Sequence, residues 1–163
     1  MKKIFSLAMM VVLFASCSQD VQFNNPSVQG LKDGYLWRAK SSSATINTVA
    51  NTITITAYNQ FETLAITVLV PNRPVSEANP MIYLLGTNPG NSITFDYVLN
   101  GLAVNYISGL KVDDGQVKIS EYDVVNKTVT GSFRFNATNT DVNSTEPEVV
   151  NFTQGVVYKV PFF

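Results

Sequence analysis

The stretch ITFDYVLNGLAVNY, residues 93–106, decides the fold of this chain. Large apolar residues recur at every second position on both sides of Asn100-Gly101. A period of two is the pattern of a β-strand that buries one face. An Asn-Gly pair between two such strands predicts a hairpin with a two-residue type I′ turn, which requires a positive φ at both central residues.

The same alternation continues on both sides of this hairpin, and no stretch has the period of a helix. Gly131 inside its strand indicates a β-bulge, and Gln154-Gly155 predicts the turn of a closing hairpin. We therefore expect an all-β protein, either an antiparallel β-sandwich or a flattened β-barrel of about ten short strands. The expected strands are 35–40, 52–58, 62–70, 81–85, 93–99, 102–106, 117–119, 129–135, 149–153 and 156–160.

The N-terminus has the pattern of a bacterial lipoprotein signal. Two lysines precede an apolar run over residues 4–14, which is too short to span a bilayer. Residues 13–17 resemble a lipobox that ends at Cys17, although Phe14 departs from the usual aliphatic residue. Ordinary secretion with cleavage after Ser18 and a retained anchor helix remain alternatives. We expect a signal peptide over 1–16, a lipidated Cys17 that begins a tether over 17–33, and an all-β domain over 34–163.

Composition limits the partners, catalytic groups and cofactors that this chain can use. Loss of the two signal-peptide lysines changes the formal charge from −1 to −3, which argues against a nucleic-acid partner. The chain has no histidine and a single cysteine, which removes Ser-His and Cys-His nucleophile pairs and the usual zinc, haem and iron–sulfur sites. We expect no cofactor and no metal. The weak exception is calcium at Asp113 and Asp114, whose Asp-Asp-Gly sequence primarily predicts a turn.

Aromatic residues are the other candidates for binding. Exposed aromatic rings on a β-sheet stack on sugar rings, and Trp37, Tyr58, Tyr97 and Tyr106 form a possible ligand platform. The same residue types are ordinary core material in β proteins, and Trp37 is the best candidate for a buried anchor. A glycosidase needs two carboxylates that face each other across a cleft, and the sequence does not place its carboxylates in that way.

Four blocks of the mature chain carry a resemblance to known proteins, together with the signal and the lipidation cysteine: Trp37-Arg38-Ala39 and residues 115–123, 128–135 and 155–161. In these blocks the chain resembles an uncharacterised lipoprotein family of Bacteroidetes-type bacteria. The resemblance implies an envelope location and favours the outer membrane. In such lipoproteins acidic residues just after the cysteine favour display at the cell surface. Here Asp20 is the one acidic residue close to Cys17, so the face of the membrane that carries the protein stays undecided. It implies no activity and no binding residues.

The sequence thus predicts an envelope-anchored lipoprotein, held to the membrane through its lipid, that acts as a non-catalytic binding or scaffolding module. Its partner would be a protein, a glycan or a small ligand. One alternative is a barrel that carries a small lipophilic ligand, which needs an apolar cavity. A second alternative is a histidine-free glycan-active enzyme.

Overall fold

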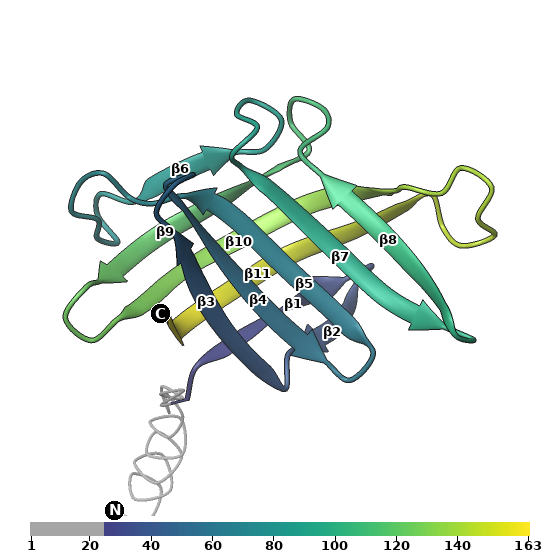
Figure 1. Ribbon diagram of the computed structural model, residues 1–163, viewed down its shortest axis with the longest axis horizontal. Coiled ribbons are helices and arrows are strands. Elements are labelled where there is room, and N and C mark those ends of the chain that lie inside the picture. The colour runs from purple at the N-terminus through teal and green to yellow at the C-terminus, as the bar shows by residue number, and fades with distance from the viewer. Residues whose placement is uncertain (1–24) are drawn as a thin grey trace, which may run out of the picture.

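The computed structural model describes residues 25–163, and these residues form one antiparallel sheet of eleven strands (Figure 1). The signal peptide and Cys17 lie outside the described residues. Within 25–163 no helix has the length and hydropathy to cross a membrane. The strands are β1 (Ser27–Lys32), β2 (Tyr35–Arg38), β3 (Ser41–Asn47), β4 (Thr52–Asn59), β5 (Glu62–Leu69), β6 (Met81–Leu84), β7 (Ser92–Leu99), β8 (Leu102–Ser108), β9 (Gly115–Asp123), β10 (Thr128–Asn139) and β11 (Val149–Pro161).

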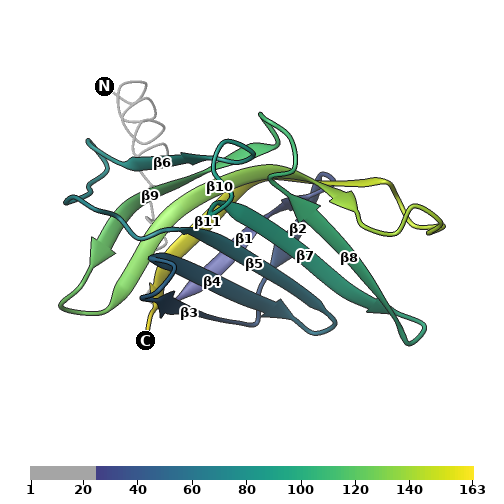
Figure 2. The ribbon, with the colours of Figure 1, turned by 45° about the horizontal axis from the view of Figure 1, so that its top comes forward.

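Strand β10 joins two layers into one sheet. Along one edge it pairs with β11, and along the other it pairs first with β9 and then, at Thr138 and Asn139, with β8. Figure 2 shows β10 curving away from β9 towards the end where β8 lies. The resulting order is β2-β1-β11-β10-β8-β7-β5-β4-β3, with β6 and β9 branching from β10.

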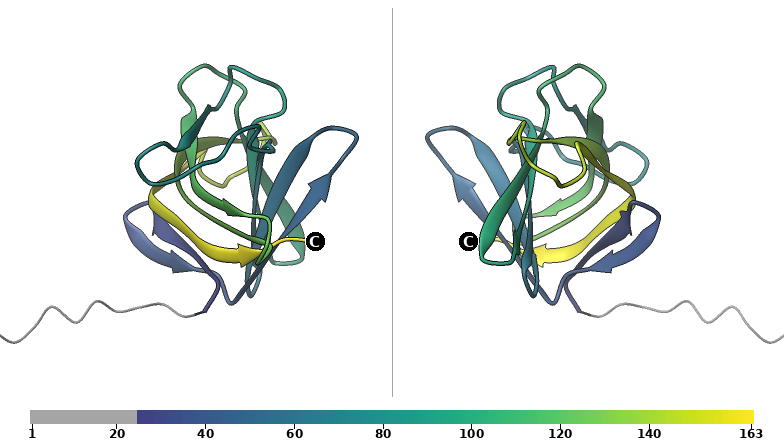
Figure 3. Two further views of the ribbon diagram at one scale, coloured as in Figure 1. Left: turned by 90° about the vertical axis from the view of Figure 1, so that its left-hand side faces the viewer. Right: turned by 90° about the vertical axis from the view of Figure 1, so that its right-hand side faces the viewer.

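The sheet curls into a half-barrel (Figure 3). The expected all-β class with an antiparallel sheet is therefore confirmed. One end of the strand order, β3, meets the C-terminal residues that follow β11. Ala44 and Phe162 form a parallel bridge, and the Phe163 N–H donates to the Ala44 carbonyl at 3.1 Å. These contacts hold the free edge of β3 against the far side of the sheet.

The core lies between the two layers, because the alternating apolar residues of the strands point inward. Ile53, Ile66 and Phe95 from one layer and Ile119 and Phe152 from the other are fully buried. Each such side chain contributes roughly 1.5–3 kcal/mol through removal of apolar surface from water. The protein's own side chains therefore fill the space between the layers.

The central hairpin of the sequence is confirmed. Leu99 pairs with Leu102, and the turn residues Asn100 and Gly101 have φ values of 51° and 81°. Two positive φ values are the signature of a type I′ turn. The bulge predicted at Gly131 is also present, since the register with β9 shifts between Thr130 and Gly131.

The expected tether is wrong at its C-terminal end. Residues 27–32 form β1, which is hydrogen-bonded to β11 on one edge and β2 on the other. Val28 is fully buried. One partner of β1, the strand β11, lies more than a hundred residues later in the chain, so the local polar sequence around Asn25-Pro26 concealed the strand. Strand β3, a serine- and threonine-rich edge strand, was likewise not anticipated.

The predicted closing hairpin is also wrong, because β11 is one continuous strand across Gln154-Gly155. Its register with β10 shifts between Phe133 and Phe135, so the turn-like pair forms a β-bulge instead. Gln154 has a φ of 51°. The Phe133 ring packs directly on Gly155, where a Cβ atom would lie 2.5 Å from ring carbons. The glycine is therefore explained by close packing and not by reversal of the chain.

Replacement of Gly155 by alanine tests this arrangement. The added methyl group would clash with the Phe133 ring, and we expect a loss of about 1–3 kcal/mol in the free energy of unfolding. Urea denaturation measures this loss, with Val156→Ala at the next, more exposed position as the control. An unchanged midpoint for Gly155→Ala would contradict the continuous strand.

Candidate functional site

A pocket of about 420 Å³ opens at one end of the half-barrel. It lies where the β1–β2 and β4–β5 turns and residues of β7 and β8 meet the loop of residues 140–148. We call it the Glu62 pocket, and its principal lining residues are Lys32, Asp33, Glu62, Tyr97, Tyr106 and Glu146.

The strands place these residues through their register. Lys32 is the last residue of β1, and Asp33 follows it in the tight turn to β2. Glu62 is the first residue of β5 and lies directly opposite Tyr97 on β7. Glu146 comes from the loop between β10 and β11. Because the charged residues sit at or beyond strand ends, they collect at the rim of the barrel, with the apolar side chains below them.

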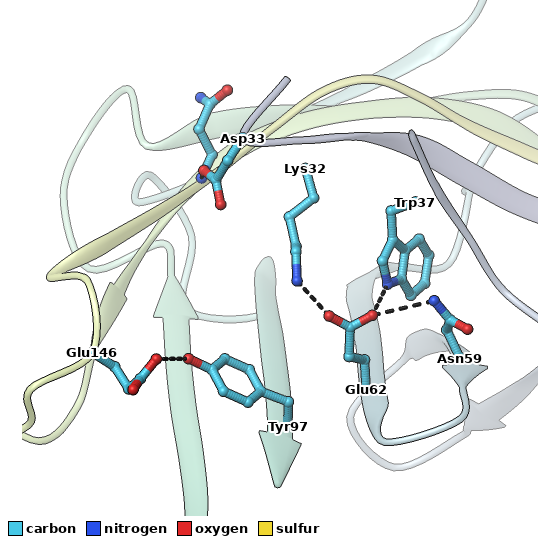
Figure 4. Close-up of polar contacts among 8 residues, drawn as sticks. Lys32, Asp33, Trp37, Asn59, Glu62, Tyr97 and Glu146 are labelled. Atoms are coloured by element: carbon cyan, nitrogen blue, oxygen red, sulfur yellow. Dashed lines mark hydrogen bonds and ion pairs between the residues drawn. The ribbon is translucent and has the colours of Figure 1, made fainter. Parts of the chain in front are cut away.

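Three donors hold the Glu62 carboxylate (Figure 4). The Lys32 ammonium forms an ion pair with Oε1. Oε2 accepts hydrogen bonds from Trp37 Nε1 at 2.7 Å and from Asn59 Nδ2 at 3.2 Å. Charge-assisted hydrogen bonds are stronger than neutral ones, so this network fixes one wall of the pocket.

The Lys32 ammonium also lies over two aromatic rings. Its Nζ atom is 4.9 Å from the centroid of the Phe95 ring and 5.8 Å from that of Tyr97. These are cation–π distances. The half-buried lysine is therefore stabilised by both the Glu62 carboxylate and the faces of the rings.

Two tyrosines connect the barrel to the 140–148 loop. The Tyr97 hydroxyl donates to Glu146 Oε2 at 2.7 Å, and the Tyr106 hydroxyl donates to the Pro147 carbonyl at 2.9 Å. Their rings stack with centroids 6.0 Å apart. Burial, together with the hydrogen bonds to Tyr106 and Glu146, raises the pKa of Tyr97 above its usual value. Tyr97 therefore remains a neutral donor that holds Glu146 in place.

The structure brings together three of the four aromatic residues proposed as a platform. Tyr97 and Tyr106 line the pocket, and Trp37 lies behind Glu62. Trp37 and Tyr106 are only 3% and 1% exposed, so the prediction of a buried Trp37 anchor is confirmed. Tyr58 stands apart on β4 with 49% of its surface exposed. The four residues do not form one exposed face.

Asp113 and Asp114 form a turn immediately before β9, as their sequence predicted. Asp113 has a φ of 72°. Asp114 Oδ2 accepts hydrogen bonds from the backbone N–H groups of Gly109 and Lys111 at 3.1 and 2.9 Å. Within the described part of the chain, no three His, Cys, Asp or Glu side chains gather in a geometry able to hold a metal ion.

Sequence reasoning missed Lys32 and Glu146 and left Glu62 without a partner. Lys32 lay in the expected tether, and Glu146 lay in a loop that appeared merely polar. Two of the partners of Glu62, Trp37 and Lys32, are 25 and 30 residues away, and no local pattern marks such pairs. A charged residue at the first position of an otherwise uncharged strand was the available signal.

The fold and the site together define an all-β half-barrel protein with a polar, aromatic-walled pocket at its open end. Residues 24–161 match the family model described as a domain of unknown function, DUF6252, and the chain belongs to that family. Comparisons with curated proteins and with solved structures gave no significant match.

The Glu62 network is expected to stabilise the fold. Glu62→Gln removes the charge that pairs with Lys32, so we expect the free energy of unfolding to fall by roughly 1–3 kcal/mol. Glu77→Gln is the matched control, because Glu77 pairs with Lys118 while 78% of its side chain is exposed. That change should cost less than about 1 kcal/mol. Equal losses in chemical denaturation would contradict a special role for Glu62.

Proposed function

We propose that this protein is an envelope-anchored lipoprotein that binds a small polar ligand in the Glu62 pocket without transforming it. The observation that carries the proposal is the arrangement of Lys32, Trp37 and Asn59 around Glu62 at the wall of a pocket open to solvent.

The dimensions and lining of the pocket support this role. Ligand pockets commonly have volumes of roughly 300–1,000 Å³, with aromatic walls and a few fixed polar groups. The Glu62 pocket, at about 420 Å³, has the size for a mono- or disaccharide or a comparable molecule. Its polar groups are held by charge-assisted hydrogen bonds, and such preorganisation lowers the entropy lost on binding.

The alternative of a lipophilic carrier has less support. A carrier barrel encloses its ligand in an apolar interior. Here that region is occupied by fully buried side chains such as Ile66, Phe95 and Phe152. The pocket at the rim is instead lined by charged and phenolic groups.

A glycan-active enzyme remains the second candidate, because Glu62 and Glu146 line the same pocket. Glycosidases use one carboxyl group as an acid and the other as a base or nucleophile. Glu62 accepts from three donors, one of them the Lys32 ammonium. Both oxygens of the Glu62 carboxylate are therefore already engaged within the protein, so binding without catalysis is the better-supported function.

The proposed location rests on the N-terminal sequence. A lipidated Cys17 would hold the domain at the membrane, because each buried CH₂ group of an acyl chain contributes about 0.8 kcal/mol. The resemblance to Bacteroidetes-type lipoproteins supports the outer membrane. The acidic domain favours a lipid anchor over a polybasic attachment.

Ligand binding can be followed through Trp37, the single tryptophan of the chain. Its indole N–H contacts Glu62, so a ligand in the pocket should change its fluorescence. Protein purified after expression of the full chain is titrated with monosaccharides, amino acids, dicarboxylates and diamines. Phe61→Ala, which removes an exposed ring from the pocket wall, should weaken binding about tenfold. Val49→Ala, a 97% exposed residue in the β3–β4 turn, should not. The absence of any response across these compounds would refute the proposed function.

Lipidation is tested by Cys17→Ala. Removal of the thiol should abolish incorporation of labelled fatty acid and release the protein from the membrane fraction, because a thioether-linked lipid requires that sulfur. A Ser18→Ala variant should remain labelled. Unchanged label and membrane retention in Cys17→Ala would refute the lipoprotein assignment.

A further inference from the structure

We propose that the ligand of the Glu62 pocket carries a positively charged nitrogen, as a primary ammonium or a guanidinium group. This inference rests on the proposed binding function and specifies its ligand. The hydrogen-bonding groups, the charge and the aromatic walls of the pocket each support it.

The side-chain donors in the interior of the pocket are already engaged within the protein. Lys32, Trp37 and Asn59 donate to Glu62. The hydroxyls of Tyr97 and Tyr106 donate to the 140–148 loop. A ligand that needs donors for its own oxygens, such as a carboxylate or a phosphate, would have to share these donors with the acceptors that they already serve.

Acceptors, in contrast, remain available. Glu146 uses Oε2 to accept from Tyr97, and in residues 25–163 no donor is assigned to its Oε1 atom. Asp33 uses Oδ1 to accept the Asn151 N–H at 2.9 Å, and in the same part of the chain Oδ2 has no assigned donor. An ionised carboxylate is an acceptor with two oxygens, so both side chains can still receive a hydrogen bond from a ligand.

The charge of the lining favours a cation. One lysine and three carboxylates give the pocket a formal charge of −2, and Lys32 is neutralised by its ion pair with Glu62. Glu146 and Asp33 then remain as unneutralised charges, since the ion pairs found within residues 25–163 include neither. Figure 4 shows Asp33, Glu62 and Glu146 surrounding the same space.

The aromatic walls are suited to the same chemistry. The rings of Phe95 and Tyr97 already hold the ammonium group of Lys32 at cation–π distance. Phe61, which is 65% exposed, adds a further ring at the mouth of the pocket. Carboxylates combined with aromatic faces are the groups by which proteins recognise ammonium and guanidinium ions.

Isothermal titration with paired probes tests the inference. Glucosamine carries an ammonium at neutral pH, whereas N-acetylglucosamine is a neutral sugar of similar shape. 1,4-Diaminobutane and Nα-acetyl-lysine amide provide the same charged group without a sugar, as a free amine and as a protein side chain. The relative affinities of the three ammonium probes identify the source of the charge.

The variant Glu146→Gln tests the role of the pocket carboxylate, and Glu148→Gln is its control. Both remove one negative charge from the same loop, but Glu148 is exposed and does not line the Glu62 pocket. We expect at least one ammonium probe to bind with one-to-one stoichiometry and N-acetylglucosamine to bind at least about tenfold more weakly than glucosamine. Glu146→Gln should weaken the ammonium probe by a similar factor, and Glu148→Gln should leave it within about twofold.

Equal affinity for glucosamine and N-acetylglucosamine, or unchanged ammonium binding in Glu146→Gln, would overturn the inference. So would the absence of ammonium binding in a protein whose Trp37 fluorescence responds to a neutral or anionic compound. In those cases the binding function would stand and only the charge of its ligand would be wrong. If no compound of any charge changed the fluorescence or produced heat, both the inference and the binding function would fail.

Discussion

The structure depends on the double pairing of β10. One edge of this strand binds β11, while the other passes from β9 to β8, so the two layers belong to one hydrogen-bonded sheet. A sheet that changes partners along one strand must bend, and the pairing of β10 has β-bulges at Gly131 and between Phe133 and Phe135, where such bending is accommodated. The same curvature brings the ends of β1, β5, β7 and β8 to a common rim. The pocket is thus a consequence of how β10 pairs.

Local sequence patterns predicted the parts of the fold that depend on neighbouring residues. The Asn100-Gly101 turn, the alternating strands and the turn at Asp113-Asp114 were all predicted, because period-two burial and turn geometry depend on only a few consecutive residues. The patterns failed at β1 and at the centre of β11. There, pairing across more than a hundred residues and the contact of Phe133 with Gly155 override what the local residues favour.

The candidate site was predictable only in part for the same reason. Trp37, Tyr97 and Tyr106 were found by residue type, since large aromatic side chains mark both cores and binding sites. Their relation to Glu62 was not visible, because Lys32, Glu62 and Glu146 come from segments far apart in the sequence. Each of these charged residues appears ordinary alone. Their chemistry arises from the partial burial that they share at the rim.

The pairing of β1 with β11 and the contact of Phe163 with Ala44 have a consequence for folding kinetics. The first and last strands of the domain are neighbours, so β1 cannot join the rest of the sheet until the C-terminal strand β11 is available. Such long-range pairing raises the contact order, and high contact order slows folding. During synthesis the nascent chain would therefore hold local hairpins such as β4–β5 and β7–β8 before the half-barrel closes. Most of the chain is thus synthesised before its two layers can be joined into one sheet.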